Sequence, residues 1–151
     1  MPLKHQRGLT LIEILVSLLV ISIGLLGVAG LHAYSLRNNF DALLRSNATA
    51  LAADIADRMR ANRGVATTTD AYVIDLATTP PALEADSPRA ARDLNEWRAA
   101  IAAALPSGVG SVAIDGATRV ATITIQWGER RSAADDNDGA ATMTFVSQTE
   151  I

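Results

Sequence analysis

An unbroken apolar run near the N-terminus constrains this chain more than any other feature. It extends from Leu9 to Leu31 and contains a single charged residue, Glu13. As an α-helix the run would be about 35 Å long at about 1.5 Å per residue, which exceeds the roughly 30 Å of a bilayer's hydrocarbon core. The run therefore predicts a membrane-spanning segment over residues 9–31 and argues against a plain soluble enzyme.

The residues that flank the apolar run predict its orientation in the membrane and whether it is cleaved from the protein. Lys4 and Arg7 lie in the short leader of residues 1–8, so the positive-inside rule places the N-terminus in the cytoplasm and everything after Leu31 on the other side of the membrane. The competing interpretation is a conventional secretory signal peptide, which has a shorter apolar core and a small-residue cleavage site at its far end. Here the run is too long and continues into further helical pattern, so we expect it to stay attached.

Residue usage excludes several classes of function. The chain has no cysteine and two histidines, which rules out disulfides, thiol nucleophiles and cysteine-based metal centres. His5 lies in the leader and His32 ends the apolar run, so they do not form a pair suited to a metal or a catalytic base. The formal net charge of −3 argues against nucleic acid as a partner. Because no catalytic motif or phosphate-binding glycine loop is present either, we expect no enzymatic activity and no cofactor.

The acidic segment Asp135–Asp138 is a candidate metal site. Asp135, Asp136, Asn137 and Asp138 precede Gly139 and look like a calcium loop, but their spacing does not match the alternating ligand positions of such loops. A solvated hairpin tip is the better interpretation of Asp135–Asp138, and we expect no metal.

Helical periodicity continues past the membrane run. Apolar residues repeat at steps of three and four with charged residues between them, which predicts one helix from about Leu9 to Asn62. Residues 32–62 form its amphipathic half, whose apolar stripe should pack against a globular head of residues 63–151. The stripe consists of Leu36, Phe40, Leu44, Ala48, Leu51, Ile55 and Met59.

The remainder of the chain predicts a small α+β head. Residues 63–89 look like an irregular connection, in which Tyr72–Ile74 could add a short strand. A helix is expected over Ala90–Leu105, followed by β-strands. The expected strands are Ser111–Ile114 and Arg119–Trp127, joined by a turn at Asp115-Gly116, and Ala141–Ser147. We therefore predict a long N-terminal helix packed on a small antiparallel sheet, with one short extra helix.

Three glycines weaken the membrane half of the long helix. Gly24, Gly27 and Gly30 recur at every third residue, and each costs about 1 kcal/mol in a helix relative to alanine. They could allow close helix packing within the membrane, as small residues often do. Alternatively, they could mark a flexible segment that partly unwinds when the chain joins an assembly. Both interpretations stay open at this point.

Glu13 also has two interpretations. A charged residue within a membrane helix costs on the order of 3 kcal/mol, so its presence suggests a function. The simpler alternative is a carboxylate near a helix N-terminus, where the helix dipole favours it.

The letters around Glu13 resemble a known processing signal. A basic leader that ends in Gly8, followed by Leu9-Thr10-Leu11-Ile12-Glu13, is similar to the N-terminus of type IV prepilins and pseudopilins. The resemblance implies the type IV pilin fold, cleavage between Gly8 and Leu9 by the prepilin peptidase, and N-methylation of Leu9 by the same enzyme. Leu9 departs from the phenylalanine that is commoner in the family. The resemblance also implies that Glu13 is an assembly contact, which would neutralise the new amine of a neighbouring subunit.

Further stretches of the sequence resemble one particular family among the type IV prepilins. Residues 18–27, the segment Asp57–Asn62, and the pattern from Trp97 to Trp127 are similar to the PilV family of minor pilins, the type IV pilus modification proteins. This branch implies a subunit that assembles with other minor pilins and the major pilin, primes pilus assembly at the tip, and has a role in adhesion or motility. The alternatives are a minor pseudopilin of a type II secretion system and a solitary membrane-anchored periplasmic binding domain.

Overall fold

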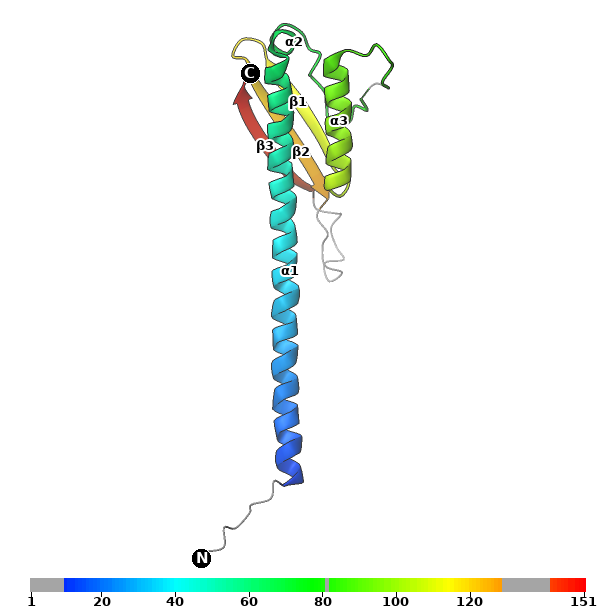
Figure 1. The fold of residues 1–151 in the computed structure, drawn as a ribbon. Helices are drawn as coiled ribbons and strands as arrows, with labels where there is room; N and C mark the ends of the chain where they lie inside the picture. Colours follow the sequence, from blue (N-terminus) through cyan, green and yellow to red (C-terminus); the bar gives the residue numbers. More distant parts are fainter. Residues whose placement is uncertain (1–9, 81, 129–141) are drawn as a thin grey trace, which may run out of the picture. The chain divides into compact units, whose positions relative to one another are not determined.

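A computed structural model describes residues 10–80, 82–128 and 142–151 of the chain. The chain divides into two compact units, residues 1–41 and residues 42–151, which are described in turn. In chain order the elements are α1 (Leu11–Ala61), α2 (Arg63–Thr68), α3 (Arg89–Ala104), β1 (Val109–Asp115), β2 (Val120–Gly128) and β3 (Thr142–Glu150), as Figure 1 shows.

The first unit consists of the N-terminal part of α1. The helix begins at Leu11, next to the predicted start, and its side chains from Leu11 to Leu31 are all exposed. Its most apolar window of 18 residues has a mean hydropathy of 2.7, and none of that window is buried. This helix is long and apolar enough to cross a membrane, as the sequence predicts.

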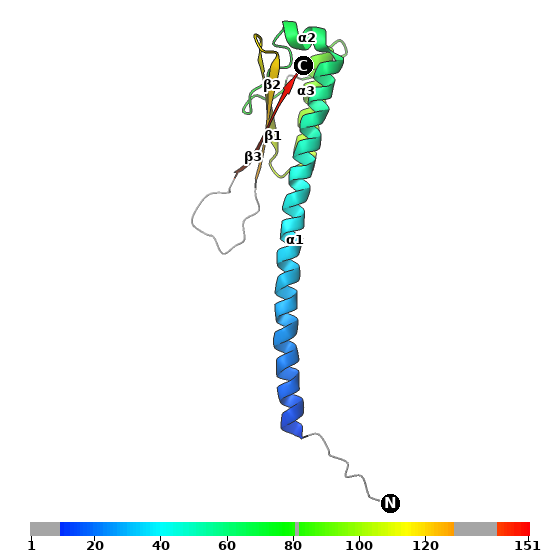
Figure 2. The same ribbon diagram turned by 90° about the vertical axis from the view of Figure 1, so that its left-hand side faces the viewer.

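The second unit, which we call the head, has the remaining part of α1 and the helix α3 on one face of a three-stranded antiparallel sheet (Figure 2). The strand order is β1-β2-β3. β1 and β2 form the predicted hairpin, whose last pair is Asp115 and Val120. Asp115 stabilises the turn because its Oδ1 accepts the backbone N–H of Ala117 at 2.8 Å, and this backbone hydrogen bond lowers the pKa of Asp115. The predicted α+β fold is therefore confirmed.

Alternation along β2 determines which face of the sheet packs against the helices. Four alternate side chains are buried and the side chains between them are half-exposed, as the period of two in this strand predicts. The buried members are Ala121, Ile123, Ile125 and Trp127.

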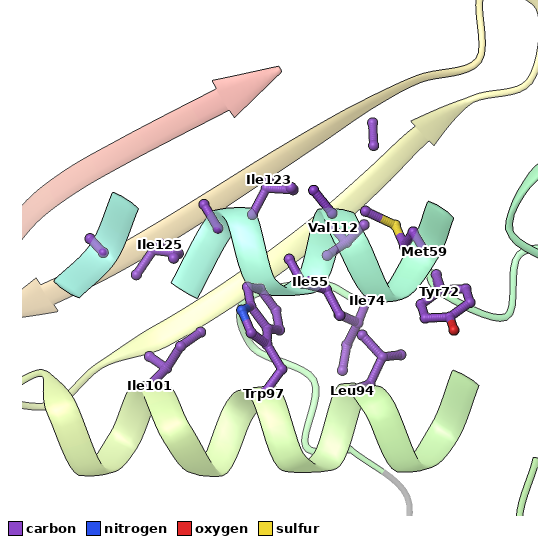
Figure 3. Packing of buried hydrophobic residues seen from close by; sticks show 14 of the residues in the cluster. Ile55, Met59, Tyr72, Ile74, Leu94, Trp97, Ile101, Val112, Ile123 and Ile125 are labelled. Atoms are coloured by element: carbon purple, nitrogen blue, oxygen red, sulfur yellow. The ribbon is translucent and has the colours of Figure 1, made fainter. Parts of the chain in front are cut away.

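The core of the head lies between this face and the two helices. Figure 3 shows Leu94, Trp97 and Ile101 of α3 pointing toward Ile55 of α1 and toward the strands. Trp97 is fully buried, and its Nε1 donates to the Leu51 carbonyl at 2.8 Å. A Cβ at Gly110 would lie 2.5 Å from the Trp97 ring, so only glycine lets β1 pass this close to α3. Every residue of this core cluster lies at or after Leu44.

Three sequence-based expectations about the elements need correction. The apolar stripe of α1 is buried only from Leu44 onward, because the core begins there; Leu36 and Phe40 are 69% and 46% exposed. Residues 63–68, expected to be irregular, form the helix α2, so two short helices follow α1 instead of one. No strand forms at Tyr72–Ile74, where Ile74 makes only an isolated antiparallel bridge to Val112.

Candidate functional site

The predicted processing site lies outside the described residues. Gly8 and Leu9 precede Thr10, the first residue whose placement the structure describes, and the Asp135–Asp138 loop also lies outside the described part. Cleavage after Gly8 and methylation of Leu9 therefore remain predictions. The described part of the site begins at the N-terminal turn of α1.

Glu13 lies in the first turn of α1. Its backbone N–H donates to the Thr10 carbonyl at 3.0 Å, and the N–H of Ile14 donates to the same carbonyl at 3.3 Å. These bonds place Thr10 at the N-cap and Glu13 at a position where the helix dipole favours a carboxylate. Within the residues that the structure describes, the Glu13 carboxylate has no hydrogen bond and no ion pair.

The other polar side chains of the apolar segment are satisfied within the helix. The Ser17 hydroxyl donates to the Glu13 carbonyl and the Ser22 hydroxyl donates to the Leu18 carbonyl, both at 2.7 Å. Such bonds to the preceding turn remove the cost of placing a hydroxyl in an apolar surrounding. From Leu11 to Leu31, Glu13 is therefore the one polar side chain without a partner among the described residues.

The three glycines lie on an uninterrupted α-helix. A Cβ added at Gly24, Gly27 or Gly30 would meet no atom within 4 Å, so the described residues of the first unit leave space for a side chain at each of them. The structure places them along α1 beyond Glu13 and does not gather them with it into one site.

A second group of polar residues lies in the head and centres on Arg58. The Arg58 guanidinium contacts Asp54 at 3.0 Å within α1, and it reaches α3 through Glu96 at 2.6 Å and Asp93 at 3.3 Å. The hydrogen bond to Glu96 is the largest of the effects that raise the pKa of Arg58. Asp93 is almost completely buried, so this contact compensates a carboxylate that would otherwise be costly.

Tyr72 completes the environment of Asp93. The Tyr72 hydroxyl donates to Asp93 Oδ2 at 2.6 Å and accepts from Asn62 Nδ2 at 3.2 Å. Burial of the phenol, followed by its hydrogen bond to Asp93, raises the pKa of Tyr72 to about 12. The hydroxyl therefore stays protonated and acts as a donor.

The segment Asp57–Asn62 thus fastens three parts of the head to the end of α1. Arg58 holds α3, and Asn62 holds the loop through Tyr72. Arg60 donates to the Thr149 hydroxyl and to the Glu150 carbonyl, and so holds the end of β3. Because Met59 belongs to the core as well, this short segment is a structural junction.

Arg98 fixes the loop between α2 and α3. Its guanidinium donates to the backbone carbonyls of Asp75 at 2.8 Å and Thr78 at 2.6 Å, and it also contacts the Leu76 carbonyl. Burial lowers the pKa of Arg98, since no carboxylate among the described residues lies within salt-bridge distance of it. The side chain holds the loop through its main chain.

The sequence analysis did not identify Tyr72, Asp93 or Arg98. A signal was present for Asp93, which occupies a helical position otherwise reserved for apolar residues, in step with Ala90, Leu94 and Trp97. A carboxylate on an apolar helix face indicates a buried polar pair. No signal in the sequence pointed to the carbonyl partners of Arg98, because backbone groups are present at every residue.

No cluster of the described residues offers metal chemistry. The structure brings together no group of three or more histidine or acidic side chains that could hold a metal ion in the part of the chain it describes. The polar clusters around Arg58 and Arg98 lie within the head, whereas the Glu13 carboxylate of the apolar segment has no partner among the described residues.

Comparison with known proteins identifies the N-terminal segment. Residues 3–29 match the family model described as the prokaryotic N-terminal methylation motif. No curated protein and no solved structure matches the chain. The matched residues include Gly8, Leu9 and Glu13 together with most of the apolar run, so the N-terminal segment of this chain carries a prepilin-like methylation motif.

Proposed function

We propose that the chain is a minor pilin of the type IV pilus that helps to prime pilus assembly. The observation that carries the proposal is the unpartnered Glu13 carboxylate in the first turn of a helix that is long and apolar enough to span a membrane. The methylation motif covers this same segment. A carboxylate retained in an apolar helix implies a partner charge, and no described residue forms an ion pair with Glu13.

Processing would supply the partner charge. Cleavage between Gly8 and Leu9 by the prepilin peptidase removes the basic leader, and methylation leaves a secondary amine at Leu9 that is still protonated at neutral pH. Glu13 lies about one helical turn from this amine in sequence. In a bundle of staggered helices, the amine of one subunit can reach Glu13 of its neighbour, and the pairing would set the register between subunits.

Topology and location follow from the same processing. The leader faces the cytoplasm, residues 9–31 cross the inner membrane, and the head enters the periplasm. After assembly with other minor pilins and the major pilin, the chain would occupy the pilus, most simply at its tip. The similarity of Asp57–Asn62 to the PilV family supports a minor over a major subunit, with a role in adhesion or motility and no enzymatic activity.

The structural junction at Asp57–Asn62 supports this assignment in physical terms. A subunit pulled through its helix must transmit force to its head, and Arg58 and Arg60 tie α1 to α3 and to β3. Such ties suit a structural subunit.

The proposal is tested by isolating the full chain from membranes of its own cells. Intact mass should show Leu9 as the first residue with one added methyl group, and pilin subunits should accompany the protein. An N-terminus beyond Leu31 would overturn the prepilin interpretation. Co-isolation with components of a type II secretion system would instead identify a minor pseudopilin, and isolation without partner subunits would indicate a solitary membrane-anchored binding domain.

A further inference from the structure

The two edges of the head's sheet differ in their partners. At the β1 edge, the N–H of Ile74 donates to the Val112 carbonyl at 3.0 Å and the N–H of Val112 donates back at 2.9 Å. β3 forms the opposite edge (Figure 1), and no strand among the described residues pairs with its outer side. Among the described residues, the β1 edge therefore carries one isolated bridge at Val112, whereas the β3 edge has no second strand partner.

The backbone groups at the β3 edge follow from the register. The N–H of Ile151 donates to the Arg119 carbonyl, which continues the pairing of β2 with β3 by one residue. Hydrogen-bonded pairs alternate with non-bonded pairs in an antiparallel ladder, so the odd-numbered residues of β3 bond to β2. The even-numbered residues point their N–H and C=O groups outward. The contact of Arg60 supports this assignment, because its guanidinium donates at 3.4 Å to the carbonyl of Glu150, an even-numbered residue whose backbone groups point outward.

The β3 edge therefore consists of the outward groups of Thr142, Thr144, Val146 and Gln148. Arg60 closes its end at Glu150. Within the described residues, these outward backbone groups have no hydrogen-bond partner in the protein.

β3 lacks the features that normally protect an edge strand. It has nine residues, pairs with β2 without a bulge, and contains no proline and no lysine. Its one charged residue is Glu150, at the end closed by Arg60. Natural proteins usually shorten, bend or charge such an edge, because an unprotected one pairs with another chain.

The core is also incompletely covered along β3. Met143 and Phe145 point to the core face but are only partly buried, whereas their partners Trp127 and Ile125 in β2 are buried. On the opposite face of the sheet, Val146 is 54% exposed. An additional strand beside β3 would cover Met143 and Phe145 and complete the core at this edge.

We propose that the β3 edge, from Thr142 to Gln148, accepts an extended strand from a different protein chain of the pilus assembly. The donor strand carries apolar side chains on its core-facing side, beside Met143 and Phe145, and neutral polar side chains on the other. Charge complementarity favours a neutral donor, because an ionised side chain would lose water beside this neutral strand without gaining a partner. This mode of recognition is strand addition to a sheet edge.

A second copy of this chain does not fit the edge. Self-pairing of β3 by a two-fold axis would be antiparallel and would direct residues 42–61 of α1 in opposite directions in the two copies. Subunits anchored in one membrane need the same direction. The proposal rests on the proposed function, since it requires the chain to join other subunits.

Amide hydrogen exchange with residue resolution tests the proposal directly. The full chain is studied in detergent, first produced alone and then isolated with its partner subunits from its own cells. Alone, the amides of Thr144, Val146 and Gln148 should exchange rapidly, while those of Phe145 and Ser147 are protected. In the assembly the even-numbered amides should slow at least about tenfold, since each gains a backbone hydrogen bond. Unchanged rapid exchange of these amides in the assembly would overturn the proposal.

A matched pair of variants separates the edge from the fold. Val146→Pro removes an outward N–H and leaves the bonds to β2 intact, so the head should keep its melting temperature while co-isolation of the donor falls about tenfold or more. Val146→Thr keeps the N–H and should retain the donor. If Glu13→Ala abolishes co-isolation but Val146→Pro leaves it intact, the proposed function stands and the edge proposal is wrong. If the unaltered chain brings no partner subunit, both fall.

Discussion

The N-terminal segment of α1 and the head place their apolar side chains in opposite ways. From Leu11 to Leu31 all side chains are exposed, whereas in the head the large apolar side chains of α1, α3 and the sheet gather into one core (Figure 3). The two regions also differ in whether their acidic side chains have partners. Buried Asp93 is surrounded by donors in the head, while Glu13 has no partner among the described residues. The buried Asp93 is therefore compensated by side chains of the head, whereas no described residue compensates Glu13.

The strongest test of this contrast is Glu13→Ala in the full chain. If the carboxylate pairs with a neighbour's amine, its removal leaves that amine buried and unpaired at about 3–5 kcal/mol, which weakens subunit association by a factor of hundreds or more. Cleavage after Gly8 should persist, because the leader and the glycine are unchanged. Co-isolation with other pilins and a count of surface pili provide the measurement.

Two further variants control for the removal of the charge. Glu13→Gln should fail in the same way at nearly constant size, while Ser17→Ala should assemble normally because the Ser17 hydroxyl is satisfied within its own helix. If Glu13→Ala assembles normally, the carboxylate is not an assembly contact. Its contribution would then be limited to its interaction with the helix dipole, which stabilises the helix by about 0.3–1 kcal/mol.

Truncation of a core side chain should destabilise the head itself, whereas truncation of Glu13 should weaken the association between subunits. Trp97→Ala should lower the free energy of unfolding of the head by about 3–5 kcal/mol, because Trp97 is fully buried in the core. Thermal unfolding of the full chain in detergent, followed by near-ultraviolet circular dichroism, measures the loss. Leu18→Ala is the matched control: Leu18 is exposed in the structure, so its truncation should leave the melting temperature of the head unchanged.

The stability of the head at alkaline pH tests the hydrogen-bonded cluster of Tyr72 and Asp93. The pKa of Tyr72 is raised to about 12 from an ordinary value of 10.0, so folding favours the protonated phenol. This stability is fully present below pH 10 and is lost as the pH rises through 10 toward 12, by about 2 kcal/mol. Tyr72→Phe, which has no ionisable hydroxyl, should flatten the dependence in this range. An equal alkaline loss in both proteins would show that Tyr72 does not titrate in this window.

The smallest effect is expected at the glycines. Gly27→Ala should stabilise the helix by about 1 kcal/mol without a steric clash, since a Cβ there meets nothing within 4 Å. Helicity of the full chain in detergent should therefore rise or stay constant. If assembly also stays normal, Gly27 is neither a packing contact nor a point of unwinding; reduced assembly with intact helicity would show that one of these roles is real.

Some parts of the head could be anticipated from local pattern, and others could not. The hairpin around Asp115-Gly116 and the helix α3 were predictable because turn chemistry and apolar periodicity act over a few residues. The helix α2 was missed because RGVATT has weak helix formers and no apolar periodicity. The short helix follows directly on the end of α1, and Ala66 packs into the core.

The sequence by itself determined the membrane-length helix, the methylation motif with its glutamate, and the alternation that turns one face of β2 inward. These depend on the composition and spacing of neighbouring residues. Only the tertiary structure decided that the buried stripe begins at Leu44 and that Arg58 and Tyr72 meet at Asp93. It also decided that Ile74 bridges to β1, while β3 has no second strand partner among the described residues. Each of these contacts joins residues far apart in the chain. Whether two such groups meet depends on how the elements pack, and a local pattern contains no record of that packing.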